Sequence, residues 1–128
     1  VCLRQESHVF FDGTAISCDG RHDWGNIGES PTAALADEQQ RLQAVLKKDL
    51  LLYDQGKGDL PFPPRVIAPR RVQTEQEVAH SKGLHYVRVD NTDHLWPTPG
   101  KIDAFLFFIR TLPDDAWLHV LCEAGCGR

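Results

Sequence analysis

Hydrophobic and polar positions along the first third of the chain predict strands followed by a helix. Residues 1–18 indicate strands joined by a tight turn at Asp12 and Gly13, because apolar runs flank a dipeptide that is typical of hairpins. Ser30 and Pro31 then begin a helix, with serine as the N-cap and proline in the first turn. The expected apolar face of this helix consists of Leu35, Leu42, Val45 and Leu46.

The middle of the chain predicts a loop and a second, short helix. The apolar run from Leu50 to Tyr53 fits either a buried strand or the end of the preceding helix. Residues 55–64 are rich in glycine and proline and indicate a loop. Thr74 and Glu77 form a T-x-x-E capping box, which predicts a helix that ends near Gly83.

The last third of the chain predicts two strands with a helix between them. Residues 84–89 indicate a strand, and residues 91–100 a loop. Apolar positions at 102, 105, 106 and 109 predict an amphipathic helix over Pro99 to Arg110. The nearly continuous apolar run from Trp117 to Leu121 fits a strand buried on both faces. This alternation favours an α/β domain with a central, mainly parallel sheet flanked by helices.

Composition narrows the class of protein. The chain has 128 residues, of which 41% are hydrophobic, enough for the core of one ordinary domain. No apolar run approaches the roughly 18 residues that a membrane span needs. The formal net charge of −4 gives no electrostatic support for nucleic-acid binding. Neither the four cysteines nor the six histidines show a metal-ligand spacing, and a disulfide scaffold is not expected.

The ends of the sequence predict that residues 1–128 are one part of a longer domain. The chain has no methionine, and Val1 already lies in an apolar, strand-like stretch. Arg128 closes a glycine-containing loop, after which a helix normally points its N-terminus at a bound phosphate. We therefore expect the isolated chain to be weakly stable and to have little or no activity.

The segment that carries candidate chemistry runs from Cys122 to Arg128 and reads CEAGCGR, a C-x5-R pattern. It follows an expected strand and so lies at the carboxyl edge of the sheet, where open α/β folds bind ligands. Its glycines let backbone N–H groups converge on an anion, and Arg128 adds a guanidinium that grips two phosphate oxygens. In that positive setting the thiolate of Cys122 is favoured, which makes it a candidate nucleophile. The residues between them are candidates for substrate binding: Glu123, Ala124, Gly125, Cys126 and Gly127.

Phosphoryl transfer from a phosphomonoester also needs a proton for the leaving alkoxide. Asp93, in the loop after the preceding strand, is the candidate general acid, and the same carboxylate can then activate water. His94 beside it is a candidate for contact with the phosphate or for holding the loop.

These features together resemble the PTP-like phytases, cysteine-dependent enzymes of the protein tyrosine phosphatase superfamily. The matching segments are Leu3 to His8, Asp23 with Trp24, Thr92 to Pro99, and Cys122 to Arg128. The resemblance covers essentially the whole chain. It implies a tyrosine-phosphatase-like fold that would end here after the phosphate-binding loop. It also implies removal of phosphates from myo-inositol hexakisphosphate.

The resemblance assigns roles residue by residue. Cys122 matches the nucleophile, Arg128 the phosphate-binding arginine and Asp93 the general acid. His94 matches a residue at the substrate, as does Asp23. The family uses no metal and no organic cofactor, and its substrate is a small polyanion rather than a nucleic acid or a membrane. The resemblance also suggests export, to the periplasm or beyond.

The chain departs from the family pattern at three positions. Leu121 stands where the family usually has a histidine, and leucine cannot hydrogen-bond the loop that holds the Cys122 thiolate. Cys2 replaces an aspartate at the start of the first motif. Asp59 stands where a basic residue is common, and its carboxylate would repel a polyphosphate.

Other functions and other roles for the same residues remain as alternative hypotheses. A protein phosphatase of the same superfamily would use the same loop, and a phosphate-binding module would keep the anion site without catalysis. A sulfurtransferase explains neither Asp93 nor the first motif. Cys122 could be an inert thiol, Asp93 a helix-entry carboxylate, and Asp23 an Asx-turn residue. Residues expected to serve the scaffold or surface are Glu6, His8 and Trp24, the pair Arg70 and Arg71, and Cys126, which could also pair with Cys122 on oxidation.

Overall fold

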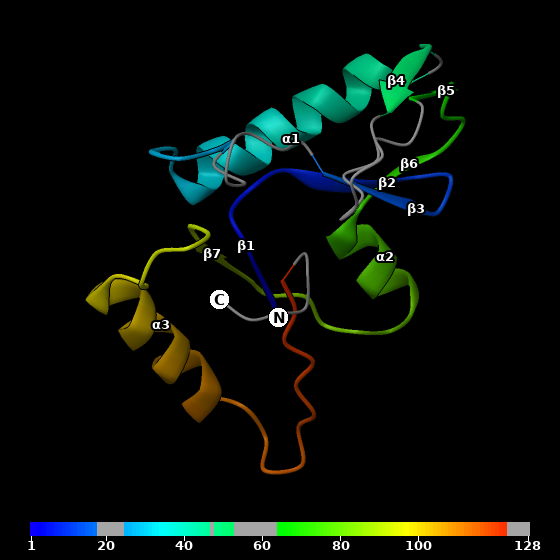
Figure 1. The fold of residues 1–128 in the computed structure, drawn as a ribbon. Helices are drawn as coiled ribbons and strands as arrows, with labels where there is room; N and C mark the ends of the chain where they lie inside the picture. Colours follow the sequence, from blue (N-terminus) through cyan, green and yellow to red (C-terminus); the bar gives the residue numbers. More distant parts are fainter. Residues whose placement is uncertain (18–24, 47, 53–63, 123–128) are drawn as a thin grey trace, which may run out of the picture.

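The computed structural model describes residues 1–17, 25–46, 48–52 and 64–122, which form a mixed α/β arrangement (Figure 1). The strands are β1 (Cys2–Arg4), β2 (His8–Phe11), β3 (Thr14–Ser17), β4 (Leu50–Leu52), β5 (Arg65–Ile67), β6 (Val72–Thr74) and β7 (Arg88–Asn91). The helices are α1 (Pro31–Val45), α2 (Glu75–Ser81) and α3 (Pro99–Arg110). The expected α/β class is therefore confirmed.

The parallel part of the fold is centred on β1. This strand pairs in parallel with β7, with Cys2 opposite Arg88 and Arg4 opposite Asn91. On its other side β1 forms a parallel bridge between Cys2 and Leu121. The backbone N–H of Leu3 donates to Leu121, and that of Leu121 donates to Val1, at 2.9 and 3.0 Å. The chain order therefore brings three distant segments side by side.

Two antiparallel sheets accompany this parallel part. The predicted hairpin is confirmed: β2 pairs with β3 around Asp12 and Gly13, both of which have positive φ. Strand β6 pairs with the other edge of β2, giving the order β3-β2-β6. The apolar run after α1 forms the strand β4, which pairs with β5. A strand is therefore observed in place of a helix end, but it is not the buried strand that was predicted, since Leu51 is 50% exposed.

Helix α1 begins where the sequence predicted, and its predicted apolar face is confirmed in part: Leu42 is buried and Val45 packs against the core. The Ser30 side chain accepts a hydrogen bond from the N–H of Ala33, as expected for an N-cap. The buried residues are Ala34, Glu38 and Leu42, whereas Leu35, predicted for the apolar face, is 43% exposed. Hydropathy misses part of the buried face because the buried Glu38 carboxylate has polar partners across the interface.

The small core lies between α1 and the β3-β2-β6 sheet, which Figure 1 shows directly beneath the helix. Val9 and Phe11, alternate residues on β2, pack with Leu42 of α1. The partly buried residues around them are Ile16, Val45, Leu50, Ile67 and Val72.

The capping box predicted for α2 is present in full. The Thr74 hydroxyl accepts from the N–H of Glu77 at 3.1 Å, and the Glu77 carboxylate accepts from the N–H of Thr74 at 2.9 Å. Gly83 follows the helix with φ of +73°, a left-handed conformation that glycine adopts without strain.

Two predicted strands differ from those observed. The strand expected at residues 84–89 is β7 at Arg88–Asn91, and Leu84 is 62% exposed. Pairing with β1 sets where this strand begins, and local sequence preference does not. The strand expected from Trp117 to Leu121 is reduced to the bridge at Leu121, and Trp117 is 98% exposed rather than buried. This segment reaches the neighbourhood of β1 only from His119 onward, where the nitrogen of Val1, directly before β1, donates to the His119 carbonyl.

Helix α3 has the predicted bounds, Pro99–Arg110, and lies apart from α1 and α2 in Figure 1. None of its residues is fully buried, and its apolar side chains Ile102, Leu106 and Phe107 are substantially exposed. Among the described residues, no helix combines the length and the apolar character needed to cross a membrane.

Candidate active site

Strand β1 brings the two candidate catalytic residues within the described part of the chain to one edge of the fold. Its two parallel neighbours are β7 and the segment that ends at Leu121. Asp93 lies two residues beyond the end of β7, and Cys122 directly follows Leu121. Because parallel strands end at the same edge, both side chains belong to the carboxyl edge of the sheet, where α/β folds bind ligands.

The loop that carries Asp93 is held by the residue that ends β7. Asn91 is buried, and its amide donates to the carbonyls of Thr92 and Leu95 at 3.3 and 3.2 Å. The N–H of Leu95 donates back to the carbonyl of Thr92. This arrangement closes a tight turn around Asp93, which fixes the position of its backbone.

The two functional candidates in this turn differ in exposure. The Asp93 side chain is 16% exposed and the His94 side chain 70% exposed, with 3.4 Å between Asp93 Oδ2 and His94 Nε2. His94 has φ of +59°, a left-handed conformation that is uncommon outside glycine. The turn thus presents an accessible imidazole beside a largely buried carboxylate.

Cys122 is a free, half-buried thiol at the end of the described chain. The remaining predicted site residues lie outside the described residues, and their roles stay predictions. These are Asp23, Glu123, Ala124, Gly125, Cys126, Gly127 and Arg128. Trp24, expected to hold the scaffold, also lies outside them.

A buried arginine holds the turn that follows β1 at this edge. Arg88 of β7 donates to the backbone carbonyls of Arg4, Gln5 and Glu6 at 2.9, 3.0 and 2.8 Å. Its remaining terminal nitrogen contacts the Glu38 carboxylate of α1 at 3.0 Å. The guanidinium therefore ties the end of β1 to both β7 and α1.

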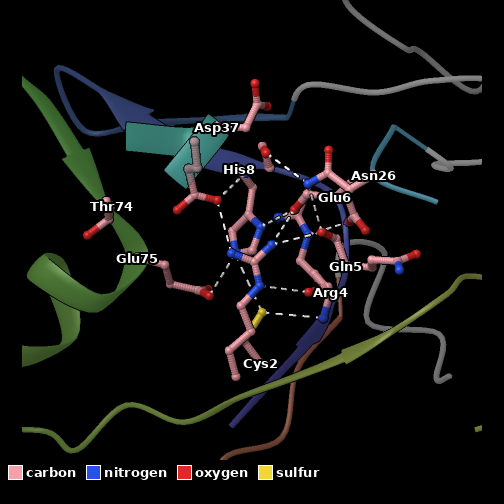
Figure 2. A network of polar contacts seen from close by, with 12 residues as sticks. Cys2, Arg4, Gln5, Glu6, His8, Asn26, Asp37, Thr74 and Glu75 are labelled. Atoms are coloured by element: carbon pink, nitrogen blue, oxygen red, sulfur yellow. Dashed lines mark hydrogen bonds and ion pairs between the residues drawn. The ribbon is translucent and has the colours of Figure 1, made fainter. Parts of the chain in front are cut away.

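Further polar contacts fill the space around this turn, as Figure 2 shows. The fully buried Glu6 pairs with Arg4, with 2.6 Å between Oε1 and Nε. The Asn26 amide donates to the carbonyl of Gln5 and to the hydroxyl of Ser7 at 3.1 and 3.0 Å. Buried charges and amides are costly unless they are paired, so these contacts specify one geometry for the turn.

A second cluster lies beside the same turn and joins β1, β2 and α2. Cys2 Sγ lies 3.4 Å from His8 Nε2, and the same nitrogen lies 2.9 Å from Glu75 Oε2. Burial alone lowers the pKa of His8, but the hydrogen bonds with Cys2 and Glu75 outweigh it and raise the pKa to about 9. Burial alone raises the pKa of Glu75, but the hydrogen bond with His8 prevails and lowers the pKa to about 2.

Sequence reasoning found part of this polar interior. It assigned Glu6 and His8 to the scaffold, and both are buried. It did not single out Glu38, Glu75 or Arg88, because each is an ordinary charged residue on a predicted helix or strand. One sequence signal was available: an unbroken polar run from Arg4 to His8 directly follows an apolar strand. In the structure all five of these polar residues are buried, which is unusual.

Comparison with known proteins settles the family. The sequence model of the PTP-like phytases, described by the term inositol hexakisphosphate, matches residues 1–128. The chain belongs to the PTP-like phytase family. This membership confirms the resemblance found in the sequence.

Solved structures of related proteins have a fold similar to that of this chain. The structure of the tandemly repeated PTP-like phytase from Mitsuokella multacida is 44% identical with a TM-score of 0.90, covering 97% of this chain and 21% of that one. A structure of the PTP-like myo-inositol phosphatase from the same organism contains myo-inositol-(1,3,4,5)-tetrakisphosphate; it is 43% identical with a TM-score of 0.90, over 97% and 21% of the two chains. The structure of a PTP-like phytase from Bdellovibrio bacteriovorus is 29% identical with a TM-score of 0.77. The match covers 97% of this chain and 42% of that one.

A curated relative is the effector protein hopD2 of Pseudomonas syringae pv. tomato. It is 34% identical over 131 residues, which cover 98% of this chain and 28% of hopD2. The chain thus spans between about one fifth and two fifths of the length of the relatives named here.

Proposed function

We propose that the protein carrying these residues hydrolyses phosphomonoesters of myo-inositol polyphosphates through a phosphocysteine intermediate. The observation that carries the proposal is the placement of β1. Its two parallel neighbours lead directly to Asp93 and to Cys122, the acid and the nucleophile that such a reaction requires. Membership of the PTP-like phytase family supports the same reaction.

In the proposed first step, the Cys122 thiolate attacks phosphorus in line with the leaving oxygen. The phosphorus–oxygen bond breaks as the phosphorus–sulfur bond forms, and the Asp93 carboxylic acid donates its proton to the departing alkoxide. The backbone amides of residues 123–127 and the Arg128 guanidinium would neutralise the charge on the equatorial oxygens.

In the second step, water attacks the phosphocysteine. The Asp93 carboxylate takes a proton from this water, inorganic phosphate leaves, and the Cys122 thiolate is regenerated. The partial burial of Asp93 beside the exposed His94 is compatible with both roles, because the carboxyl lies at the edge of the site and not in bulk water.

The proposed substrate is a small polyanion of the inositol phosphate class. Support comes from the Mitsuokella multacida relative, whose structure contains an inositol tetrakisphosphate. The chain itself has a net charge of −4, so affinity must come from positive groups gathered at one site and not from the overall charge.

The test is phosphate release from myo-inositol hexakisphosphate by the whole protein and by its Cys122→Ser variant. Serine cannot supply a thiolate, so the rate should fall by roughly 10⁴-fold or more. A matched Cys18→Ser variant removes a thiol to which no role is given, and it should keep the rate of the unmodified protein. Equal release by the Cys122→Ser variant would remove the proposed mechanism.

A second arm separates the role of Asp93 from that of Cys122. Asp93→Asn should slow release from inositol hexakisphosphate by about 10²- to 10⁴-fold, because the alkoxide needs a proton. The loss should be much smaller in the first step of an aryl phosphate, whose leaving phenolate needs no proton. Comparable turnover of phosphotyrosine peptides and inositol hexakisphosphate would instead favour a protein phosphatase.

A further inference from the structure

The cluster of Cys2, His8 and Glu75 has the arrangement of a metal site. One sulfur, one nitrogen and one oxygen from these residues all lie within 4.8 Å of one another. Tetrahedral zinc would separate its sulfur and nitrogen ligands by about 3.6 Å, and its nitrogen and oxygen ligands by about 3.4 Å. The observed sulfur–nitrogen and nitrogen–oxygen separations, 3.4 and 2.9 Å, differ from those values by no more than about half an ångström.

The surroundings of each ligand atom also suit a metal. His8 Nδ1 lies 2.8 Å from the backbone carbonyl of Glu6, so that ring nitrogen carries a proton and Nε2 faces the cluster. The backbone N–H of Arg4 donates to Cys2 Sγ at 3.4 Å and helps to fix the position of the sulfur. The hydroxyl of Tyr86 donates to Glu75 Oε2 at 3.0 Å and orients that carboxylate.

The cluster is largely shielded from water. Cys2 is fully buried and the His8 side chain is 3% exposed, while Glu75 at 17% supplies the solvent side. His8 Nε2 lies against both Sγ and Oε2, and one cation among them would contact all three ligand atoms at once. A divalent ion with one thiolate and one carboxylate also has no net charge, which suits a buried position.

We propose that Cys2, His8 and Glu75 form a zinc site that fastens β1 and β2 to α2. The mixture of thiolate, imidazole and carboxylate ligands is one that zinc accepts, and a water molecule completes the tetrahedron. The site is structural and takes no part in the phosphate chemistry. Its effect is to fix β1, the strand whose neighbours lead to Asp93 and Cys122.

The test measures metal in the whole protein after incubation with zinc, removal of free ions and elemental analysis. The expected result is one zinc per chain at this site, lost in Cys2→Ser and in Glu75→Gln. The melting temperature should rise by about 5–10 °C when zinc exceeds its dissociation constant a hundredfold, and a chelator should reverse the rise. His80→Gln, an exposed change on the same helix, should leave metal content unchanged.

Cobalt substitution gives a spectroscopic test that can be made on the unmodified protein. Cobalt bound at this site should show a thiolate-to-cobalt charge-transfer band and the visible bands of tetrahedral cobalt. Cys122→Ser should retain both bands, since the candidate nucleophile is not a ligand. Absence of bound zinc in the unmodified protein, cobalt bands without thiolate character, or bands lost in Cys122→Ser would each overturn the proposal.

Discussion

Arg88 holds a long stretch of backbone beside the described part of the candidate site. It donates to three carbonyls of the turn after β1 and pairs with the buried Glu38. Arg88→Met should lower the free energy of unfolding by about 3–5 kcal/mol, because it leaves a buried carboxylate without its partner. Urea denaturation measures this loss, and adding Glu38→Gln to the variant should recover part of it. A loss below about 1 kcal/mol would show that the guanidinium does not hold the turn.

For single residues, the sequence identifies candidate catalytic side chains more readily than it identifies which side chains contact one another. Cys122 and Asp93 could be singled out as candidates because the C-x5-R segment and a loop that contains an aspartate each follow a predicted strand. The cluster of Cys2, His8 and Glu75 could not, because Glu75 lies 67 positions from His8 and no short spacing joins them. Partners of that kind become neighbours only through pairing of strands and helices, which no local pattern records.

The capping box at the start of α2 is the clearest stabilising feature of any single helix. Thr74→Ala removes the side-chain acceptor for the N–H of Glu77 and should cost about 1 kcal/mol, or about 3–5 °C in melting temperature. Because Thr74 precedes Glu75, the variant should also weaken zinc retention at the proposed site. Ser30→Ala, the cap of α1, is the matched control: it should cost a similar amount and leave zinc retention unchanged.

Elements with strong local signals were predicted well, and elements defined by distant pairing were not. The hairpin at Asp12, the capped α2 and the bounds of α3 follow from turn, cap and periodicity signals within a few residues. The position of β7 depends on β1, which lies more than 80 residues earlier. The apolar run at residues 117–121 favoured a strand, but outside Leu121 no ladder forms among the described residues.

At the scale of the whole molecule, a large apolar surface stays uncovered in this chain. Among the described residues, the buried hydrophobic cluster consists of Val9, Phe11 and Leu42. Trp117 is 98% exposed and Phe107 71% exposed, and no residue of α3 is fully buried. Exposed apolar area of this kind contributes nothing to folding and marks surfaces that bind other parts of a protein or cause aggregation.

The isolated 128-residue chain is therefore expected to be only marginally stable. Urea denaturation followed by circular dichroism should give a free energy of unfolding below the roughly 5 kcal/mol typical of independent domains. Phosphate release from inositol hexakisphosphate should be negligible, because α3 and residues 117–120, which flank the segments of Asp93 and Cys122, bury too little apolar surface to hold those segments in one position. The whole protein is the control, and it should unfold at higher urea. The contrary result would be a cooperative transition with a free energy of unfolding above about 5 kcal/mol and robust phosphate release by the isolated chain. That result would show that the exposed face of α3 and residues 117–120 need no covering partner.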